Sequence, residues 1–176
     1  MKRILLLLVL TCSIVAEVNA QKTPYPVRPK INIGAEFGIP RRSGFGEYFN
    51  FGFGGSGKLE VPFTAALYGT ASAGFISYYS KRTLIGSNEK LNNKSYIPLK
   101  LGVRYYLSKA FYGAGELGAS VGVQRNSGSS MIWAPGVGFL FPLSERGALD
   151  AGVRYERWVR DGGNIDQVGI RVAYQF

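Results

Sequence analysis

VGIRVAYQF, residues Val168–Phe176, is the stretch that decides the fold. Its large apolar side chains share one parity, namely Val168, Ile170, Val172, Tyr174 and Phe176. The other parity is small or polar, namely Gly169, Arg171, Ala173 and Gln175. Alternation at a period of two predicts a β-strand with one apolar face. Bulky side chains against lipid and an aromatic ring at the interface are typical of a membrane-spanning strand.

The first 20 residues are typical of a secretory signal peptide. A short basic start is followed by the apolar run Ile4–Leu10 and by Val18-Asn19-Ala20, which suits cleavage before Gln21. The apolar run is too short for a spanning helix, which needs about 20 residues. We therefore expect residues 1–20 to be removed. Lipoprotein processing at Cys12 is the alternative, although threonine is a poor residue before such a cysteine.

The composition of the exported chain excludes several kinds of chemistry. Cleavage after Ala20 leaves no cysteine, and therefore no disulfide or thiolate. Histidine is absent, which removes the commonest general base and metal ligand. The remaining chain has 19 basic and 10 acidic side chains, a net charge of +9. In an exported protein this charge favours anionic lipid or surface polysaccharide over nucleic acid.

The rest of the sequence predicts strands. No convincing helical period follows residue 20, and 24 glycines with 11 tyrosines and 11 phenylalanines favour β-structure. Residues 21–29 contain three prolines and are expected to form an extended periplasmic lead-in. Alternation then predicts eight strands, at residues 31–39, 49–61, 65–79, 97–107, 111–123, 133–141, 149–156 and 168–176.

Two of these strands have irregular features. In the third, Leu67, Ala71, Ala73 and Phe75 are placed outward, which puts Tyr68, Ile76 and Tyr78 on the opposite face. In the sixth, Pro135 would remove a hydrogen bond between strands, so we expect a local bulge or kink.

The connections between the predicted strands alternate in length. The longer ones are polar or basic, at residues 40–48, 80–95, 124–130 and 159–164, whereas 62–64, 108–110 and 143–147 are short. Outer-membrane barrels have short periplasmic turns and longer outer loops. The predicted fold class is therefore all-β, an eight-stranded antiparallel up-and-down transmembrane β-barrel over residues 30–176, with both termini at the short-turn end.

Charge on the polar face distinguishes this barrel from a soluble one whose faces are reversed. That face has five acidic and five basic residues: Glu36, Lys58, Glu60, Lys100, Arg104, Glu116, Asp150, Arg154, Glu156 and Arg171. Charges enclosed in a narrow barrel need partners, because an unpaired one incurs a desolvation penalty. An interior of eight strands is only wide enough for side chains to fill. We therefore expect a filled, ion-paired lumen.

Basic residues gather in the longer connections, and Arg157 lies at the edge of the seventh strand. The connection group is Arg41, Arg42, Lys81, Arg82, Lys90, Lys94, Arg125 and Arg160. These cations either form a solvated rim or contact lipopolysaccharide phosphates.

Aromatic residues gather near both ends of the predicted strands, as in the girdles of membrane barrels. Near the longer connections they are Phe49, Tyr79, Tyr96, Trp133 and Trp158. Near the short turns they are Phe63, Phe111, Phe141, Tyr174 and Phe176.

The export signal, the eight predicted strands and the aromatic last residue resemble the small outer-membrane β-barrel proteins of the OmpX and OmpA transmembrane-domain type. YIPLKLGVRYYL, at Tyr96–Leu107, and APGVGF, at Ala134–Phe139, are similar to strands of the outer membrane protein β-barrel domain group. The resemblance covers nearly all of residues 30–176. It implies location in the outer membrane of a Gram-negative cell, and recognition of Val168–Phe176 by the barrel-assembly machinery.

Other motifs do not indicate an enzyme. GFGGSGK, at Gly52–Lys58, has the spacing of a phosphate-binding loop, but Leu59 stands where a magnesium-binding Ser or Thr belongs. The barrel lipid A deacylases and proteases of similar type depend on histidine, which is absent. Five bases oppose the five lumenal carboxylates, which favours salt bridges over an acid–base pair. We expect no catalytic residue, metal, cofactor or nucleic-acid partner.

The expected function is a structural or surface-interaction role, with basic outer loops that contact lipopolysaccharide or a surface partner. Two alternatives remain: a narrow, porin-like channel for ions or small solutes, and a secreted soluble barrel that binds an apolar ligand.

Overall fold

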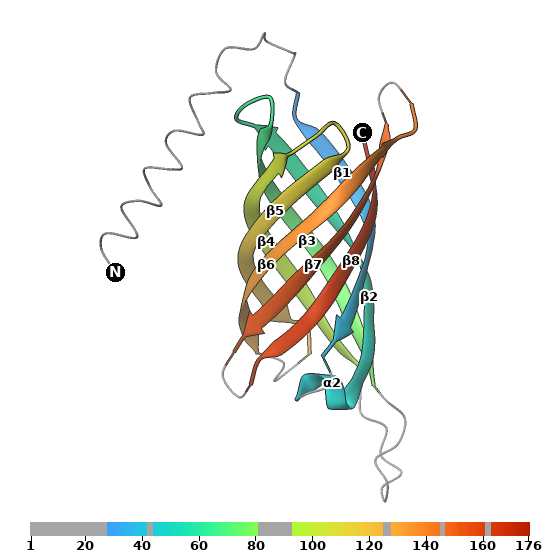
Figure 1. Cartoon of the computed structure of the whole chain (residues 1–176). Coiled ribbons are helices and arrows are strands. Elements are labelled where there is room, and N and C mark those ends of the chain that lie inside the picture. The colour runs from blue at the N-terminus through green and yellow to red at the C-terminus, as the bar shows by residue number, and fades with distance from the viewer. Residues whose placement is uncertain (1–27, 42–43, 81–92, 125–127, 145–146, 161–162) are drawn as a thin grey trace, which may run out of the picture.

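Eight strands pair antiparallel in sequence order in the computed structural model, and β1 pairs with β8 to close a barrel (Figure 1). The structure describes residues 28–41, 44–80, 93–124, 128–144, 147–160 and 163–176. The strands are β1 (Lys30–Pro40), β2 (Phe49–Pro62), β3 (Leu67–Ser80), β4 (Lys94–Tyr106), β5 (Phe111–Gly122), β6 (Ser129–Pro142), β7 (Ala148–Val159) and β8 (Ile165–Gln175). A single helical turn, α2 (Phe45–Tyr48), lies between β1 and β2. The predicted fold class is confirmed.

Connections at one end of the barrel are tight turns. The N–H of Phe63 donates to the carbonyl of Leu67 at 2.8 Å, and the N–H of Leu107 donates to the carbonyl of Phe111 at 3.0 Å. The start of β1 and the C-terminus lie at this short-turn end (Figure 1). The expected signal peptide, including Cys12, and most of the expected lead-in lie outside the described residues.

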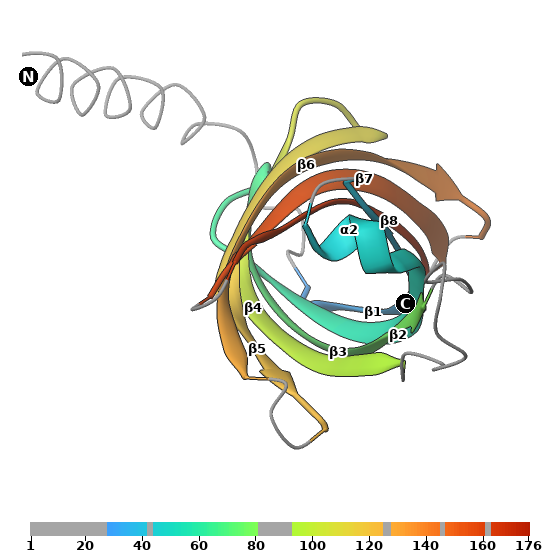
Figure 2. The same cartoon turned by 90° about the horizontal axis from the view of Figure 1, so that it is seen from below.

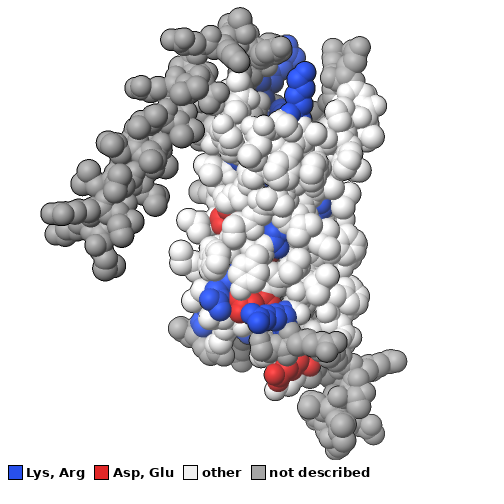
Figure 3. Space-filling model, viewed as in Figure 1, with Lys and Arg blue, Asp and Glu red and all other residues white. Residues whose placement is uncertain are grey.

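Outward side chains make a broad apolar belt. Leu101 is 69% exposed, Ile33 60% and Leu117 59%, whereas Asn32 and Glu60 on the inward parity are fully buried. On the face shown in Figure 3, charged side chains gather near the two ends, with a largely uncharged band between them. The exterior is therefore suited to lipid.

The inward and outward faces of β3 follow the predicted assignment. Tyr68, Ile76 and Tyr78 are buried inside the barrel, whereas Ala73 and Phe75 are exposed on its outside. The interior is therefore not uniformly polar.

Several strands extend beyond the apolar alternation. The predicted eighth strand began at Val168, but β8 begins at Ile165, and β7 continues three residues beyond the predicted end at Glu156. Arg157 and Asp166 occupy outward positions in these extensions. Backbone pairing continues where the outward side chains become polar, so an apolar pattern underestimates the length of the strands.

Three predicted girdle aromatics lie inside the barrel instead. The β2–β3 register shifts between Phe49 and Phe51, and such a bulge changes which face a residue occupies, so Phe49 turns inward. Tyr96 and Trp158 are buried because they share the inward parity of the charged residues on their strands. The girdle prediction is wrong for these three.

The other predicted girdle residues lie on the outward parity. Tyr79 and Trp133 are exposed near the longer connections. At the short-turn end, Phe63, Phe141, Tyr174 and Phe176 are exposed, and Phe111 is half-buried.

A local bulge or kink was expected at Pro135, and the structure shows no bulge there. Trp133 pairs with Arg157 and Gly136 pairs with Arg154, so the same number of residues separates the pairs on both strands. Pairing between β6 and β7 is interrupted at Ala134 and Pro135, and the register is the same on both sides of the interruption. The cause is that proline lacks the N–H that would form a hydrogen bond there.

Candidate functional site

The lumen brings together all ten charged residues predicted for the polar face. Nine are buried, and the side chain of Arg154 is 14% exposed. They come from β1, β2, β4, β5, β7 and β8. We call these ten residues the lumenal ion-pair network: Glu36, Lys58, Glu60, Lys100, Arg104, Glu116, Asp150, Arg154, Glu156 and Arg171.

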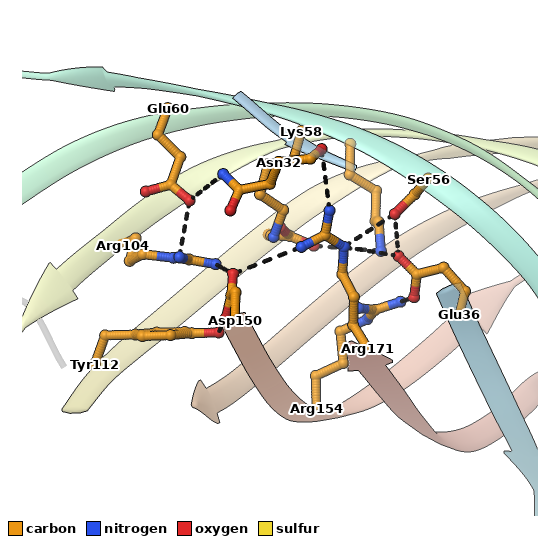
Figure 4. Close-up of polar contacts among 12 residues, drawn as sticks. Asn32, Glu36, Ser56, Lys58, Glu60, Arg104, Tyr112, Asp150, Arg154 and Arg171 are labelled. Carbon is orange, nitrogen blue, oxygen red and sulfur yellow. Dashed lines mark hydrogen bonds and ion pairs between the residues drawn. The ribbon is translucent and has the colours of Figure 1, made fainter. Parts of the chain in front are cut away.

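Arg104 is held between two carboxylates and an aromatic ring (Figure 4). Its Nη1 lies 2.8 Å from Glu60 Oε1, and its Nη2 lies 2.9 Å from Asp150 Oδ2. Its guanidinium carbon lies 3.8 Å from the centroid of the Tyr112 ring, and the Tyr112 hydroxyl donates to Asp150 Oδ1 at 2.5 Å. A Cβ at Gly138 would overlap this hydroxyl, so glycine there leaves room for Tyr112.

Arg171 and Arg154 extend the network through Glu36. Arg171 Nη1 lies 3.5 Å from Asp150 Oδ2, and its Nε lies 3.3 Å from Glu36 Oε1. Arg154 Nη2 lies 2.5 Å from Glu36 Oε2, and its Nε lies 2.5 Å from Glu156 Oε1. The Ser56 hydroxyl donates to Glu36 and accepts from Arg171 Nε at 3.0 Å.

Two lysines complete the network. Lys100 Nζ lies 3.0 Å from Glu156 Oε1 and 3.2 Å from Glu116 Oε2. Lys58 Nζ lies 2.5 Å from Glu116 Oε1.

The recorded ion pairs join the ten residues into one unbranched sequence of alternating sign. It runs from Glu60 through Arg104, Asp150, Arg171, Glu36, Arg154, Glu156, Lys100 and Glu116 to Lys58. Its two ends, Glu60 and Lys58, lie two residues apart on β2, so the sequence crosses the lumen and returns. Each charge is compensated locally, as burial in a medium of low polarity requires.

Other inward side chains, including the cation Lys30, lie beside the network. Asn32 Nδ2 donates to Glu60 Oε1 at 2.8 Å, and the Tyr106 hydroxyl donates to Glu60 Oε2 at 3.0 Å. Lys30 Nζ lies 4.9 Å from the centroid of the Tyr68 ring and 5.0 Å from that of Tyr106. All of these residues lie on the inward parity of their strands, and that parity is the sequence feature by which they could have been predicted.

A second cluster fills the lumen toward the longer connections. We call it the aromatic plug: Phe45, Phe49, Ile76, Tyr78, Tyr96, Ile132, Ala134, Trp158 and Ile165. Phe45 of α2 stacks on Phe49 at 4.3 Å between ring centroids and meets Tyr78 edge-on at 5.1 Å. Viewed along the barrel axis, α2 lies within the outline of the strands (Figure 2). The sequence did not predict α2 or this cluster.

Hydrogen bonds connect the aromatic plug to the lumenal ion-pair network. The Trp158 Nε1–H donates to Glu156 Oε2 at 3.0 Å, and Gln167 Nε2 donates to the same oxygen at 2.6 Å. The Tyr78 hydroxyl donates to Gln167 Oε1 at 2.6 Å. Buried aromatic polar groups are thus paired, which stabilises one arrangement of both clusters.

Two small cavities lie beside the network in the described part of the barrel. Lys58, Arg104, Glu116, Arg154 and Arg171 contribute to the lining of a cavity of about 30 Å³. A second cavity, of about 20 Å³, lies near Pro98 and Trp158. Each has room for about one or two water molecules.

The predicted connection cations divide into two groups. Arg42, Lys81, Arg82, Lys90 and Arg125 lie outside the described residues. Arg41 is exposed, whereas Lys94 and Arg160 are half-buried beside the aromatic plug. Arg160 Nη1 donates to the Tyr96 hydroxyl at 3.1 Å, and Lys94 Nζ lies 6.0 Å from the centroid of the Phe49 ring.

The predicted assembly residues lie on the outward parity of β8 and just beyond it. Val168, Val172, Tyr174 and Phe176 are exposed, and Ile170 is half-buried. The Phe176 N–H donates to the carbonyl of Ile31 at 2.9 Å. The segment therefore closes the barrel against β1, and its recognition during assembly stays a prediction.

Within the described ranges, no helix has both the length and the apolar character to cross a membrane. Among the same residues, no group of three or more Cys, His, Asp and Glu side chains could hold a metal ion.

Comparisons with known proteins match in fold. No model of a known protein family matches the chain, and no curated protein matches it in sequence. The crystal structure of Ail, the attachment invasion locus protein of Yersinia pestis, in complex with the heparin analogue sucrose octasulfate, matches with a TM-score of 0.56. It is 18% identical, and the match covers 84% of this chain and 97% of Ail.

Two further structures in lipid give similar matches. The structure of Yersinia pestis Ail in a phospholipid bilayer nanodisc has a TM-score of 0.57 and 17% identity, over 85% of this chain and 100% of that chain. Outer membrane protein AlkL in lipid bilayers has a TM-score of 0.51 and 14% identity, over 89% of this chain and 93% of that chain. A closed barrel with an apolar belt satisfies its backbone hydrogen bonds within a membrane. The chain therefore has the fold of the small eight-stranded outer-membrane β-barrels.

Proposed function

We propose that this protein is a non-enzymatic outer-membrane barrel with a closed lumen, which acts at the cell surface through the end that carries the longer connections. The observation that supports this function best is the unbranched lumenal ion-pair network beneath the aromatic plug. Opening a path through it would separate buried opposite charges, each of which would then lack a partner.

A filled lumen favours a structural or surface-interaction role over transport. The lumenal ion-pair network and the aromatic plug are buried in the described part of the barrel, and the two cavities described there have room for about one or two water molecules each. Partner specificity is then expected in the longer connections, because exposed loops on a rigid scaffold tolerate variation.

The chemistry of the partner is anionic. The connection cations Arg41, Arg42, Lys81, Arg82, Lys90, Lys94, Arg125 and Arg160 give the outer end a positive potential. Lipopolysaccharide phosphates and acidic polysaccharides are the anions of that surface. The complex of Ail with a heparin analogue supports the choice, since a barrel of this fold can accommodate a sulfated saccharide.

The remaining parts of the proposal concern biogenesis. Residues 1–20 direct export and are removed, residues 21–29 form a periplasmic lead-in, and the barrel-assembly machinery recognises Val168–Phe176. The longer connections then face outward.

A conductance assay tests the closed lumen. Purified protein inserted into a planar bilayer at about 1 M KCl is expected to give no steady single-channel steps. A wide porin inserted under the same conditions serves as the control for insertion. Steady steps that scale with salt concentration would replace this proposal with the channel alternative.

Binding in low salt tests the anionic partner. Neutralising Arg41, Arg42, Lys81 and Arg82 together to Gln should weaken binding to lipopolysaccharide, because screening and charge removal act on the same attraction. Lys109→Gln, in the short turn between β4 and β5, removes one positive charge at the other end and serves as a control for position. Equal loss in the two variants would remove the support for an outer basic surface.

A further inference from the structure

An ion pair lies on the outer wall of the barrel, facing away from the lumen. Arg157 of β7 and Asp166 of β8 are paired neighbours on the outward parity. Arg157 Nε lies 2.7 Å from Asp166 Oδ1, and its Nη2 donates to Oδ2 at 3.1 Å. The Tyr155 hydroxyl donates to Asp166 Oδ1 at 2.9 Å. Figure 3 shows basic and acidic side chains together on this face, over the lower ends of β7 and β8.

The wall carries an excess of positive charge at this level. Arg157 uses Nε and Nη2 for Asp166, which leaves Nη1 without a recorded partner among the described residues. Its side chain is 41% exposed, against 17% for Asp166. Arg41 follows β1 on the other side of Asp166 and is exposed, and its N–H donates to the Asp166 carbonyl at 2.7 Å. Two guanidinium groups thus accompany one carboxylate.

An apolar hollow lies directly beside this charged row, toward the short-turn end. Its outward lining residues include Gly113, Pro135, Val153, Tyr155 and Val168.

The strand register links the hollow to the charges. Trp133, Arg157 and Asp166 are successive neighbours across β6, β7 and β8, and Tyr155 and Val168 form the next outward row. The rings of Trp133, in the charged row, and Tyr155, at the edge of the hollow, lie 5.6 Å apart, and such aromatics are typical of a membrane interface.

We propose that this wall binds a phosphorylated glycolipid of the outer leaflet. One phosphate lies against Arg157 and Arg41, and one acyl chain lies in the hollow on the short-turn side of the charged row. Asp166 orients the Arg157 guanidinium so that its free edge faces the lipid headgroups. The assignment rests on the proposed outward orientation of the longer connections, and it names a site on the wall that shares Arg41 with the connection cations.

The test measures lipid retention by native mass spectrometry. The full-length mature protein is placed in nanodiscs of phosphatidylcholine that contain a small fraction of diphosphoryl lipid A. The double variant Arg157→Gln/Asp166→Asn removes the pair without a change of net charge. Loss of one charge-assisted phosphate contact should reduce lipid A retention about tenfold.

A second variant tests the hollow independently. A Cβ at Gly113 would meet only Leu107 Cδ1, at 3.8 Å, so Gly113→Leu fills the hollow without a backbone clash. Gly57→Leu is the matched control, because Gly57 also faces outward into open space, on the wall of β2. Gly113→Leu should reduce lipid A retention severalfold, and Gly57→Leu should leave it unchanged.

Three results would overturn the site. They are equal retention of lipid A by the double variant, equal effects of the two glycine variants, and retention of phosphatidylglycerol or dephosphorylated lipid A as strongly as of diphosphoryl lipid A. Conductance in a planar bilayer would overturn the closed lumen but not this site. Conversely, loss of the site would leave the proposed function standing.

Discussion

At the scale of single residues, the order of the lumenal ion-pair network predicts which charges matter most. Arg104 has carboxylates on both sides, whereas Lys58 ends the sequence, with Glu116 as its one ion-pair partner among the described residues. Among the described residues, Arg104→Met leaves Glu60 without an ion-pair partner and Asp150 with the longer contact to Arg171, and is expected to destabilise the barrel by about 3–5 kcal/mol. Lys58→Met should destabilise it less, because Glu116 keeps Lys100. Thermal unfolding in detergent measures both.

Arg157→Met is the matched control for Arg104→Met. Arg157 also forms two contacts with a carboxylate, but on the exposed outer wall, where such a pair contributes about 0–1 kcal/mol. Equal shifts in unfolding temperature for the two arginine variants would contradict the assignment of the network as a buried structural unit.

The charged residues of the lumen could be read from the sequence, but their partners could not. Charge at one parity of an alternating strand was sufficient to place Arg104 inside. Its contact with Asp150, 46 residues away, depends on how side chains from opposite walls meet across the interior. Strand periodicity contains no information about that distance.

At the scale of elements, α2 and the aromatic plug behave as one unit. Phe45 contributes the α2 side of the plug, with ring contacts to Phe49 and Tyr78. Phe45→Ala should open the end of the lumen that the aromatic plug fills, because a single helical turn has little stability without its packing. Trp158 is 1% exposed, so its fluorescence reports on this opening.

The measurement uses a Trp133→Phe background, which leaves Trp158 as the only tryptophan of the chain. Acrylamide quenching of Trp158 should rise several-fold in Phe45→Ala. Phe51→Ala removes an exposed aromatic two residues from Phe49 and should leave quenching unchanged. If the quenching of Trp158 is the same in both variants, α2 does not close the lumen toward the longer connections.

The unpredicted part of the site lies in these elements for a physical reason. Alternation places a residue correctly only while the register is continuous, and the bulge between Phe49 and Phe51 breaks it. The helix α2 is too short to show a helical period. It is stabilised by tertiary contacts that a local pattern does not contain.

At the scale of the whole molecule, the last strand joins the two ends of the sheet, and this predicts a difference between assembly and stability. Phe176 makes a backbone hydrogen bond to Ile31 and a ring contact with Tyr174 at 4.8 Å, but its side chain is 62% exposed. Deletion of Phe176 therefore removes little buried area, and the unfolding temperature of refolded protein should change only slightly. Insertion in cells should fall markedly, because the proposed recognition of Val168–Phe176 by the barrel-assembly machinery precedes the pairing of the last strand with β1. Heat-modifiable protein in outer-membrane fractions measures insertion, with Phe63→Ala, an exposed aromatic at the same end, as the control. Normal insertion of the deletion variant would show that closure against β1 does not require the terminal ring.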